Sequence, residues 1–282
     1  KDAMQAGAVG FSTSRATTHN TPDGSPVASR IADWSELEYL VGQLAELNAG
    51  IIQVGPDVGN GAAHLACLEQ LRGLAIRSGR PVMFGTFSTR QGEDPYPWQR
   101  QLQFIDEAAA AGGRMYGQAT TRSINALFSF KSYLPFDQLP AWREFRDMPM
   151  DEQVARLRDK GLRARLIADE ENMRPRDGVF QGGGAATTDP RKPDYDNLFA
   201  LLDVRWDDPS IGQLSREQSK HPVEVMMDLS LDNGMDQIFV QPLVNESPDD
   251  VLGMLRHPRT LATFSDSGAH VCQEMGASLQ TH

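Results

Sequence analysis

The chain has 282 residues, with 27 basic and 38 acidic side chains and a formal net charge of −11 at pH 7. An apolar fraction of 40% supports a sizeable core and excludes an intrinsically disordered chain. The acidic balance argues against nucleic acid or an anionic membrane as partner, because phosphate groups are bound by clustered Lys and Arg. No apolar run approaches the roughly 18 residues of a membrane-spanning helix. Cys67 and Cys272 are too few for a disulfide scaffold, so we expect a cytoplasmic protein with free thiols.

An amphipathic helix, a Gly or Pro break and a short apolar strand alternate along the chain. A strand over residues 8–12 opens the series, and leucines at helical spacing then predict a helix over 35–48. Further helices are predicted over residues 64–78, 98–111, 222–233 and 248–255. The later strands follow these helices, at residues 51–54, 81–87, 114–119, 237–242 and 259–266.

This alternation is typical of α/β proteins, in which a parallel sheet is covered by helices. A doubly wound sheet and a (β/α)8 TIM-like barrel both fit the order of elements. No strand is followed by the GxGxxG turn of dinucleotide-binding sheets, which favours the barrel. The barrel is incomplete with about six strands, so we expect the chain to be an internal piece of a longer enzyme.

The alternation stops in the middle of the chain. We therefore expect three segments: barrel units in residues 1–119, an insertion in 120–221, and the final barrel units in 222–282. The insertion contains an aromatic-rich stretch at 123–147, a charged helical stretch at 149–172 and a Gly-rich stretch at 181–190. Long insertions of this kind form lids, substrate walls or oligomer contacts, or simply pack on the barrel. The aromatic side chains make a homodimer plausible.

The residues with the clearest chemical potential follow the last predicted strand. The sequence TFSDSGAH at residues 263–270 places Asp266 at the end of an apolar strand and delivers His270 after a Gly turn. Catalytic groups of barrels lie at the carboxyl ends of the strands. An aspartate there can ligate a divalent metal or take a proton from metal-bound water. Alternatively, Asp266 caps the following turn, as is common for Asp-Ser-Gly.

Three stretches together resemble a known family. They are GAVGFSTSR at residues 7–15, HNTPDG at 19–24 and FSDSGAH at 264–270. This combination is similar to the amidohydrolase superfamily, and within it to the D-aminoacylase or N-acyl-D-amino-acid deacylase branch. The resemblance implies a distorted barrel of which this chain spans about the second half. A small β-sandwich built from both ends of the full-length protein would lie outside it.

The resemblance also implies an activity. It is the hydrolysis of an amide-type C–N bond in an N-acyl amino acid or related amide, by a water activated at a zinc ion. Asp266 would be a metal ligand and the catalytic residue that carries the water's proton to the leaving amine. The implied substrate-binding residues are His270, Ser12, Ser14, Arg15 and His19. Arg15 would anchor a substrate carboxylate through its guanidinium, or else form a surface salt bridge.

The chain also departs from the family pattern. The His-x-His metal pair of the first barrel strand is not in this sequence. The fifth and sixth strands normally end in a metal-binding histidine, but residues 51–57 and 82–87 contain none. Gln53 and Thr86 are poor zinc ligands beside imidazole. We therefore expect at most one zinc ion, held by Asp266 and mainly by ligands outside this segment.

Two alternatives stay open at this point. The first is a non-catalytic barrel whose degenerate metal site serves as a binding or assembly module. The second is a hydrolase that uses the carboxylate pair Asp57 and Asp266 without metal, as glycosidases do. For the hydrolase the expected partner is a small-molecule substrate.

Overall fold

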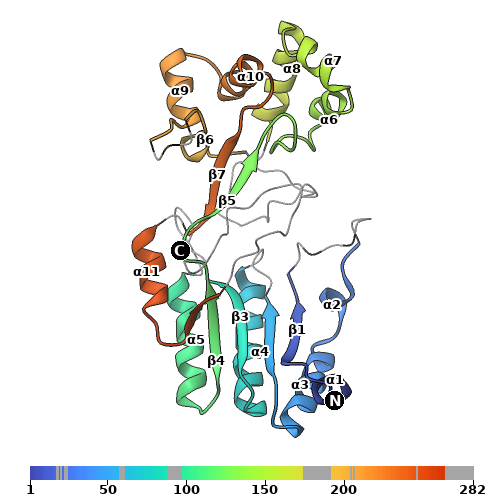
Figure 1. Ribbon diagram of the computed structural model, residues 1–282, viewed down its shortest axis with the longest axis vertical. Coiled ribbons are helices and arrows are strands. Elements are labelled where there is room, and N and C mark those ends of the chain that lie inside the picture. Colours follow the sequence, from blue (N-terminus) through green and yellow to red (C-terminus); the bar gives the residue numbers. More distant parts are fainter. Residues whose placement is uncertain are drawn as a thin grey trace.

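The computed structural model shows two parts, one above the other along the long axis of the molecule (Figure 1). The lower part is a parallel sheet with helices, and the upper part is mainly helical with a small antiparallel sheet. The structure describes residues 1–16, 19, 21, 25–56, 61–87, 97–173, 192–203, 205, 207–245 and 247–263.

The lower part contains a five-stranded sheet in the order β1-β2-β3-β4-β8, and every neighbouring pair is parallel. Its strands are β1 (Gly10–Ser14), β2 (Ile51–Gly55), β3 (Val82–Phe87), β4 (Met115–Ala119) and β8 (Thr260–Ala262). Parallel neighbours need a crossover connection, usually a helix, and the sequence supplies one between successive strands. The described residues form an open sheet and do not show a closed barrel.

The helices of the lower part pack on one face of this sheet. They are α3 (Trp34–Glu46), α4 (Gly61–Ser78), α5 (Trp98–Ala110) and α11 (Pro248–Leu255), with the short α1 (Asp2–Gln5) and α2 (Ala28–Ile31) nearby. Ile52 and Val54 of β2 and Val82 and Phe84 of β3 are completely buried against them. Because side chains alternate along a strand, the residues between these point to the opposite face.

That opposite face, here called the open face, is more polar. It carries Ile51 and Gln53 of β2, Met83 of β3, and Tyr116 and Gln118 of β4, which are half-buried or exposed. Arg259 stacks over the Tyr116 ring, with 5.7 Å from the guanidinium carbon to the ring centroid. Parallel sheets are usually covered on both faces. The helices that form the core of the lower part all lie on the other side.

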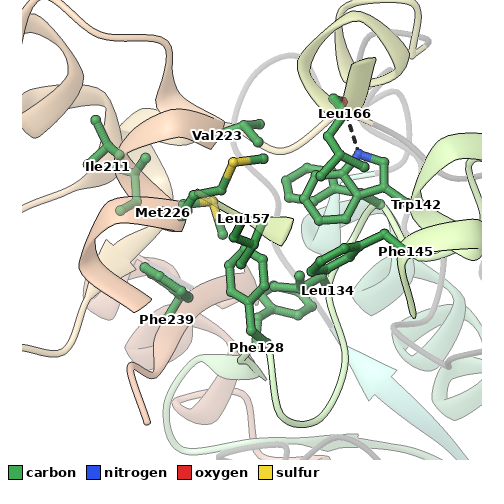
Figure 2. Packing of buried hydrophobic residues seen from close by; sticks show 14 of the residues in the cluster. Phe128, Leu134, Trp142, Phe145, Leu157, Leu166, Ile211, Val223, Met226 and Phe239 are labelled. Carbon is green, nitrogen blue, oxygen red and sulfur yellow. Dashed lines mark hydrogen bonds between the residues drawn. The ribbon is translucent and has the colours of Figure 1, made fainter. Parts of the chain in front are cut away.

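The upper part has its own core. Its strands are β5 (Ile124–Phe128), β6 (Phe199–Ala200) and β7 (Phe239–Val244), antiparallel in the order β5-β7-β6. Its helices are α6 (Pro140–Arg146), α7 (Met150–Arg156), α8 (Lys160–Glu171), η1 (Tyr195–Asn197), α9 (Ile211–Gln218) and α10 (Pro222–Asp232). Figure 2 shows Trp142 inside this core, where its indole N–H donates to the carbonyl of Leu166 at 3.0 Å. Phe136 packs against Trp142 with ring centroids 4.7 Å apart and ring planes tilted by 40°.

The predicted strands are confirmed in five cases, and one is assigned to the wrong sheet. Residues 237–242 were expected among the barrel strands, but β7 pairs antiparallel with β5 and β6. Helix α10 packs with α8 and α9 in the upper core, so residues 222–244 lie with the upper part. The reason is that a helix–Gly–strand unit has the same local pattern in either sheet, and only the partner strand distinguishes the two.

The aromatic-rich stretch is used for packing. Phe130, Phe136, Trp142 and Phe145 are completely buried in the upper core. These side chains therefore do not supply an exposed dimer contact, and the homodimer stays a prediction. No helix in the described ranges is both long and apolar enough to cross a membrane.

Within the described residues the chain crosses between the two parts twice. The first crossing follows β4 at residues 120–123, and the second follows β7 and leads into α11. The two crossings are joined by a buried hydrogen bond of 2.7 Å from the amide of Asn245 to the hydroxyl of Thr120. Because the first crossing starts where β4 ends, the carboxyl edge of the parallel sheet faces the upper part (Figure 1).

Candidate functional site

The candidate site lies at the carboxyl edge of the parallel sheet. All five strands run in the same direction, so their carboxyl ends meet at this edge. Open α/β sheets and barrels both bind their ligands there, because the loops that follow the strands converge. The chain leaves β8 at this edge and continues into the residues 264–270 motif.

A row of hydrogen-bonded polar side chains crosses the open face near this edge. The hydroxyl of Ser12 in β1 donates to Oε1 of Gln53 in β2 at 2.5 Å. Nε2 of Gln53 donates to Oε1 of Gln118 in β4 at 3.3 Å. Nε2 of Gln118 donates to the hydroxyl oxygen of Thr263, just past β8, at 3.0 Å. We call Ser12, Gln53, Gln118 and Thr263 the amide row.

The register of the sheet explains why these side chains meet. Ser12 lies directly opposite Gln53 in the β1–β2 pair, so both point to the same face. Strand β3 lies between Gln53 and Gln118, and the residue of β3 opposite Gln118 is Gly85. Because glycine has no side chain, the two carboxamides can approach across β3. The row therefore spans the sheet from β1 to β8.

Ser14 and Arg15 shape the turn after β1. The hydroxyl of Ser14 accepts the backbone N–H of Ala16 at 3.2 Å. Nη1 of Arg15 donates to the carbonyls of Ser29 at 3.1 Å and Ala32 at 2.5 Å, at the end of α2. Among the described residues, the contacts of the Arg15 guanidinium are with these helix-end carbonyls, and none is a salt bridge. A role for Arg15 in substrate binding stays a prediction.

The other predicted site residues do not join the amide row in the described part of the chain. His19 is exposed in the loop between β1 and α2, where its carbonyl accepts Nη1 of Arg30 at 3.1 Å. Asp266 and His270 lie outside the described residues, as does Asp57. Their predicted roles therefore stay predictions. The structure brings Ser12 into the amide row and shows Ser14 and Arg15 in local turn contacts.

Three members of the row, Gln53, Gln118 and Thr263, were not expected as site residues. Thr263 is exposed, and its N–H bonds the carbonyl of Leu261 at 3.0 Å, which turns the chain immediately after β8. The signal that could have found Gln118 is a glutamine inside the otherwise apolar strand at residues 115–119, matched by Gln53 inside 51–55. A polar side chain in a buried strand faces either a partner or a site.

The described side chains at this edge do not fit a zinc ion. Within the described ranges, no group of three or more His, Cys, Asp or Glu side chains could hold a metal. The amide row offers carboxamide and hydroxyl oxygens, whereas protein zinc sites use imidazole, thiolate and carboxylate. The chemistry available from the row itself is neutral hydrogen bonding to a polar ligand.

Comparison with known proteins gives the following. No family model matches the chain. An uncharacterised protein of Mycobacterium tuberculosis strain H37Rv is 24% identical over 290 residues, covering 96% of this chain and 44% of the relative. An uncharacterised protein of Mycobacterium bovis matches to the same extent. The chain thus spans less than half the length of the curated relatives it matches.

Two solved structures are similar to the chain over 92% of its length. The first is an N-acyl-D-glutamate deacylase from Bordetella bronchiseptica with zinc and a phosphonate inhibitor, at 13% identity, TM-score 0.42 and 40% coverage of that chain. The second is a D-aminoacylase with a binuclear metal centre, at 12% identity, TM-score 0.41 and 39% coverage. Both are deacylases. TM-scores below 0.5 do not establish a shared fold.

Proposed function

We propose that this chain belongs to a hydrolase of the amidohydrolase kind, which cleaves an amide-type C–N bond of an N-acyl amino acid or related amide. One observation carries the proposal. The sequence FSDSGAH at residues 264–270 follows directly in the chain after Thr263, which lies just past β8 and is the last member of the amide row. The most family-specific motif of the sequence therefore starts beside a polar surface able to bind amide and carboxyl groups.

In this proposal Asp266 acts as general base and then as general acid. Its carboxylate takes a proton from the water that attacks the acyl carbon, and a C–O bond forms. The C–N bond then breaks, and the same proton passes to the leaving nitrogen. Ser12 and the carboxamide of Gln53 face the substrate as neutral hydrogen-bonding groups. His270, four positions after Asp266 in the sequence, contacts the substrate in this proposal.

In this proposal a single zinc ion would be bound by Asp266 and by residues outside the described ranges. The amide row would not bind it, because its side chains do not fit a zinc site. A zinc ion bound to water lowers the pKa of that water toward about 7. Metal analysis of the full-length protein, before and after dialysis against a chelator, tests this part of the proposal.

The activity is tested by a substitution at Asp266 in the full-length protein. We expect Asp266→Asn to lower kcat on N-acetylated amino acids by about 10²- to 10⁴-fold, the usual contribution of a general acid–base group. Hydrolysis is measured by release of the free amine. Asp236→Asn is the matched control, since Asp236 forms an exposed ion pair with Lys131 in the upper part. Full activity in the Asp266→Asn protein, together with indifference to chelator, would contradict the proposal.

The amide row also favours a second candidate, a binding module without catalysis. Its donors and acceptors are neutral, and they suit ligand binding without a metal ion. This candidate predicts that calorimetry detects binding of N-acetylated amino acids while no amine is released.

A glycosidase-like pair of Asp57 and Asp266 requires carboxyl groups within about 10 Å of each other.

A further inference from the structure

The hydrogen bonds of the amide row all run in one direction. Ser12 donates to Gln53, Gln53 donates to Gln118, and Gln118 donates to Thr263. Each carboxamide thus accepts on its oxygen and donates from its nitrogen. Hydrogen bonds arranged head to tail polarise one another, so the last group in the series is affected by all the others.

Thr263 is the last group. Its hydroxyl oxygen accepts the amide N–H of Gln118, so its hydroxyl hydrogen is left to donate. Among the described residues this hydrogen has no acceptor, and the side chain is exposed at the carboxyl edge of the sheet. A hydroxyl whose oxygen already accepts a hydrogen bond is a stronger donor than an isolated one.

The position of Thr263 is also restrained. Its N–H bonds the carbonyl of Leu261 at 3.0 Å, and its side chain is held by Gln118 from β4, a strand paired with β8. The hydroxyl is therefore held from both its backbone and its side chain, next to the motif that contains Asp266. A donor held in this way does not have to be ordered when the ligand arrives, which favours binding.

We propose that Thr263 is a substrate-binding residue that donates its hydroxyl hydrogen to an oxygen of the N-acyl amino acid, and that Gln118 is its positioning residue. This inference rests on the proposed function. The oxygen is either the carboxylate of the amino acid or the acyl oxygen of the bond that is cleaved. The kinetic test below distinguishes these two oxygens.

The first test compares two threonines of the same strand region in the full-length protein. Thr263→Val removes the donor and keeps the shape, and we expect kcat/KM on N-acetylated amino acids to fall by about ten- to a hundredfold. Thr260→Val is the matched control. The hydroxyl of Thr260 is buried and has no hydrogen-bond partner among the described residues, so we expect this variant to keep full activity. Thr263→Ser, which restores the hydroxyl, recovers most of the loss.

The parameter that changes identifies the oxygen. A contact with the carboxylate is made equally in the ground state and the transition state, so its loss raises KM. A contact with the acyl oxygen strengthens as negative charge develops there, so its loss lowers kcat. Either result supports the proposal.

The second test addresses Gln118. Gln118→Met has similar length but cannot donate to Thr263, and we expect a smaller loss in the same kinetic parameter as in Thr263→Val. Because both changes act on one contact, the double variant should be no worse than Thr263→Val alone. Equal kcat/KM for Thr263→Val, Thr260→Val and wild type would overturn this inference and leave the proposed function standing. A wild-type enzyme that hydrolyses no N-acyl amino acid would overturn the proposed function instead.

Discussion

At the scale of single residues, buried and half-buried charges link neighbouring elements of the upper part. Glu170, completely buried, accepts the hydroxyl of Tyr195 at 2.7 Å and lies 3.2 Å from Nζ of Lys192. Burial, followed by the charge of Glu170, raises the pKa of the Tyr195 hydroxyl, which therefore stays a hydrogen-bond donor at every physiological pH. A buried carboxylate needs such partners, since an unpaired one costs several kcal/mol.

Asp228 joins two helices of the upper part. Its carboxylate accepts Nη2 of Arg163 in α8 at 2.6 Å and Nζ of Lys220 at 2.6 Å. Burial alone would raise its pKa, but the hydrogen bonds and charges of Lys220 and Arg163 outweigh burial and lower the pKa below 3.8. The ionised form is therefore favoured in the folded protein, and protonation favours unfolding.

This predicts a pH-dependent effect of Asp228→Asn. At pH 7 the free energy of unfolding should fall by about 1 kcal/mol, the upper range for a partly exposed ion pair. The stabilisation by Asp228 is complete above 3.8, its unfolded-state pKa, and is lost as the pH falls through the lower folded-state value. The difference between variant and wild type should therefore shrink in acid. Urea titrations from pH 7 to pH 3 measure it.

Asp232→Asn is the control for this experiment, because Asp232 is exposed at the end of the same helix, α10. A carboxylate at a helix C-terminus is unfavourable, so this variant should not lose stability at pH 7. A loss in Asp228→Asn that is equally large at every pH would contradict the ion-pair explanation.

At the scale of elements, the pairing of β1 with β2 depends on a glycine. Gly10 lies opposite Ile51 in the parallel register. A Cβ atom added at Gly10 would overlap the carbonyl oxygen of Ile51, which is backbone and cannot rotate away. The close approach of the two strands at this point therefore requires a residue without a side chain.

We expect Gly10→Ala to destabilise the lower part by about 1–3 kcal/mol, the cost of overpacking. Gly42→Ala is the matched control in helix α3, where the added Cβ meets nothing within 4 Å. Alanine in a helix interior is favoured over glycine, so this control should gain about 0.5–1 kcal/mol. Opposite signs in chemical denaturation support the explanation, and a neutral Gly10→Ala variant contradicts it.

At the scale of the whole molecule, the chain builds two hydrophobic cores. One contains Leu71 of α4 under the parallel sheet, and the other contains Phe136 and Trp142 in the upper part. The described core clusters share no residue. The two chain crossings and the Asn245–Thr120 hydrogen bond link the two parts. We therefore expect the two parts to unfold as separate cooperative units.

This predicts that core truncations act locally. Phe136→Ala should cost about 3–5 kcal/mol and speed amide hydrogen exchange in β5, β7 and α8, with little change in β2 and β3. Leu71→Ala should cost about 2–5 kcal/mol and speed exchange in β2 and β3, with little change in β5, β7 and α8. Exchange followed by mass spectrometry on the full-length protein measures both. Equal acceleration in both parts by either variant would indicate one cooperative unit.

Much of the local structure was predictable from the sequence. The helix over residues 35–48 appears as Trp34–Glu46, and the helix over 222–233 as Pro222–Asp232, because apolar periodicity, Gly stops and Pro at the first turn are local signals. Five parallel strands were predictable for the same reason. The partner of strand 237–242 was not, since its local pattern is the same in a parallel and an antiparallel sheet.

For the site, the sequence by itself determined the motif after the last strand and the absence of histidine from residues 51–57 and 82–87. It could not determine the amide row. Gln118 and Thr263 are 145 positions apart in the chain, and their hydrogen bond exists because β8 pairs with β4 in one particular register. A short motif consists of consecutive residues and can be read from them alone. A contact between distant strands depends on the tertiary structure, because strand pairing determines which strands are neighbours and which side chains share a face.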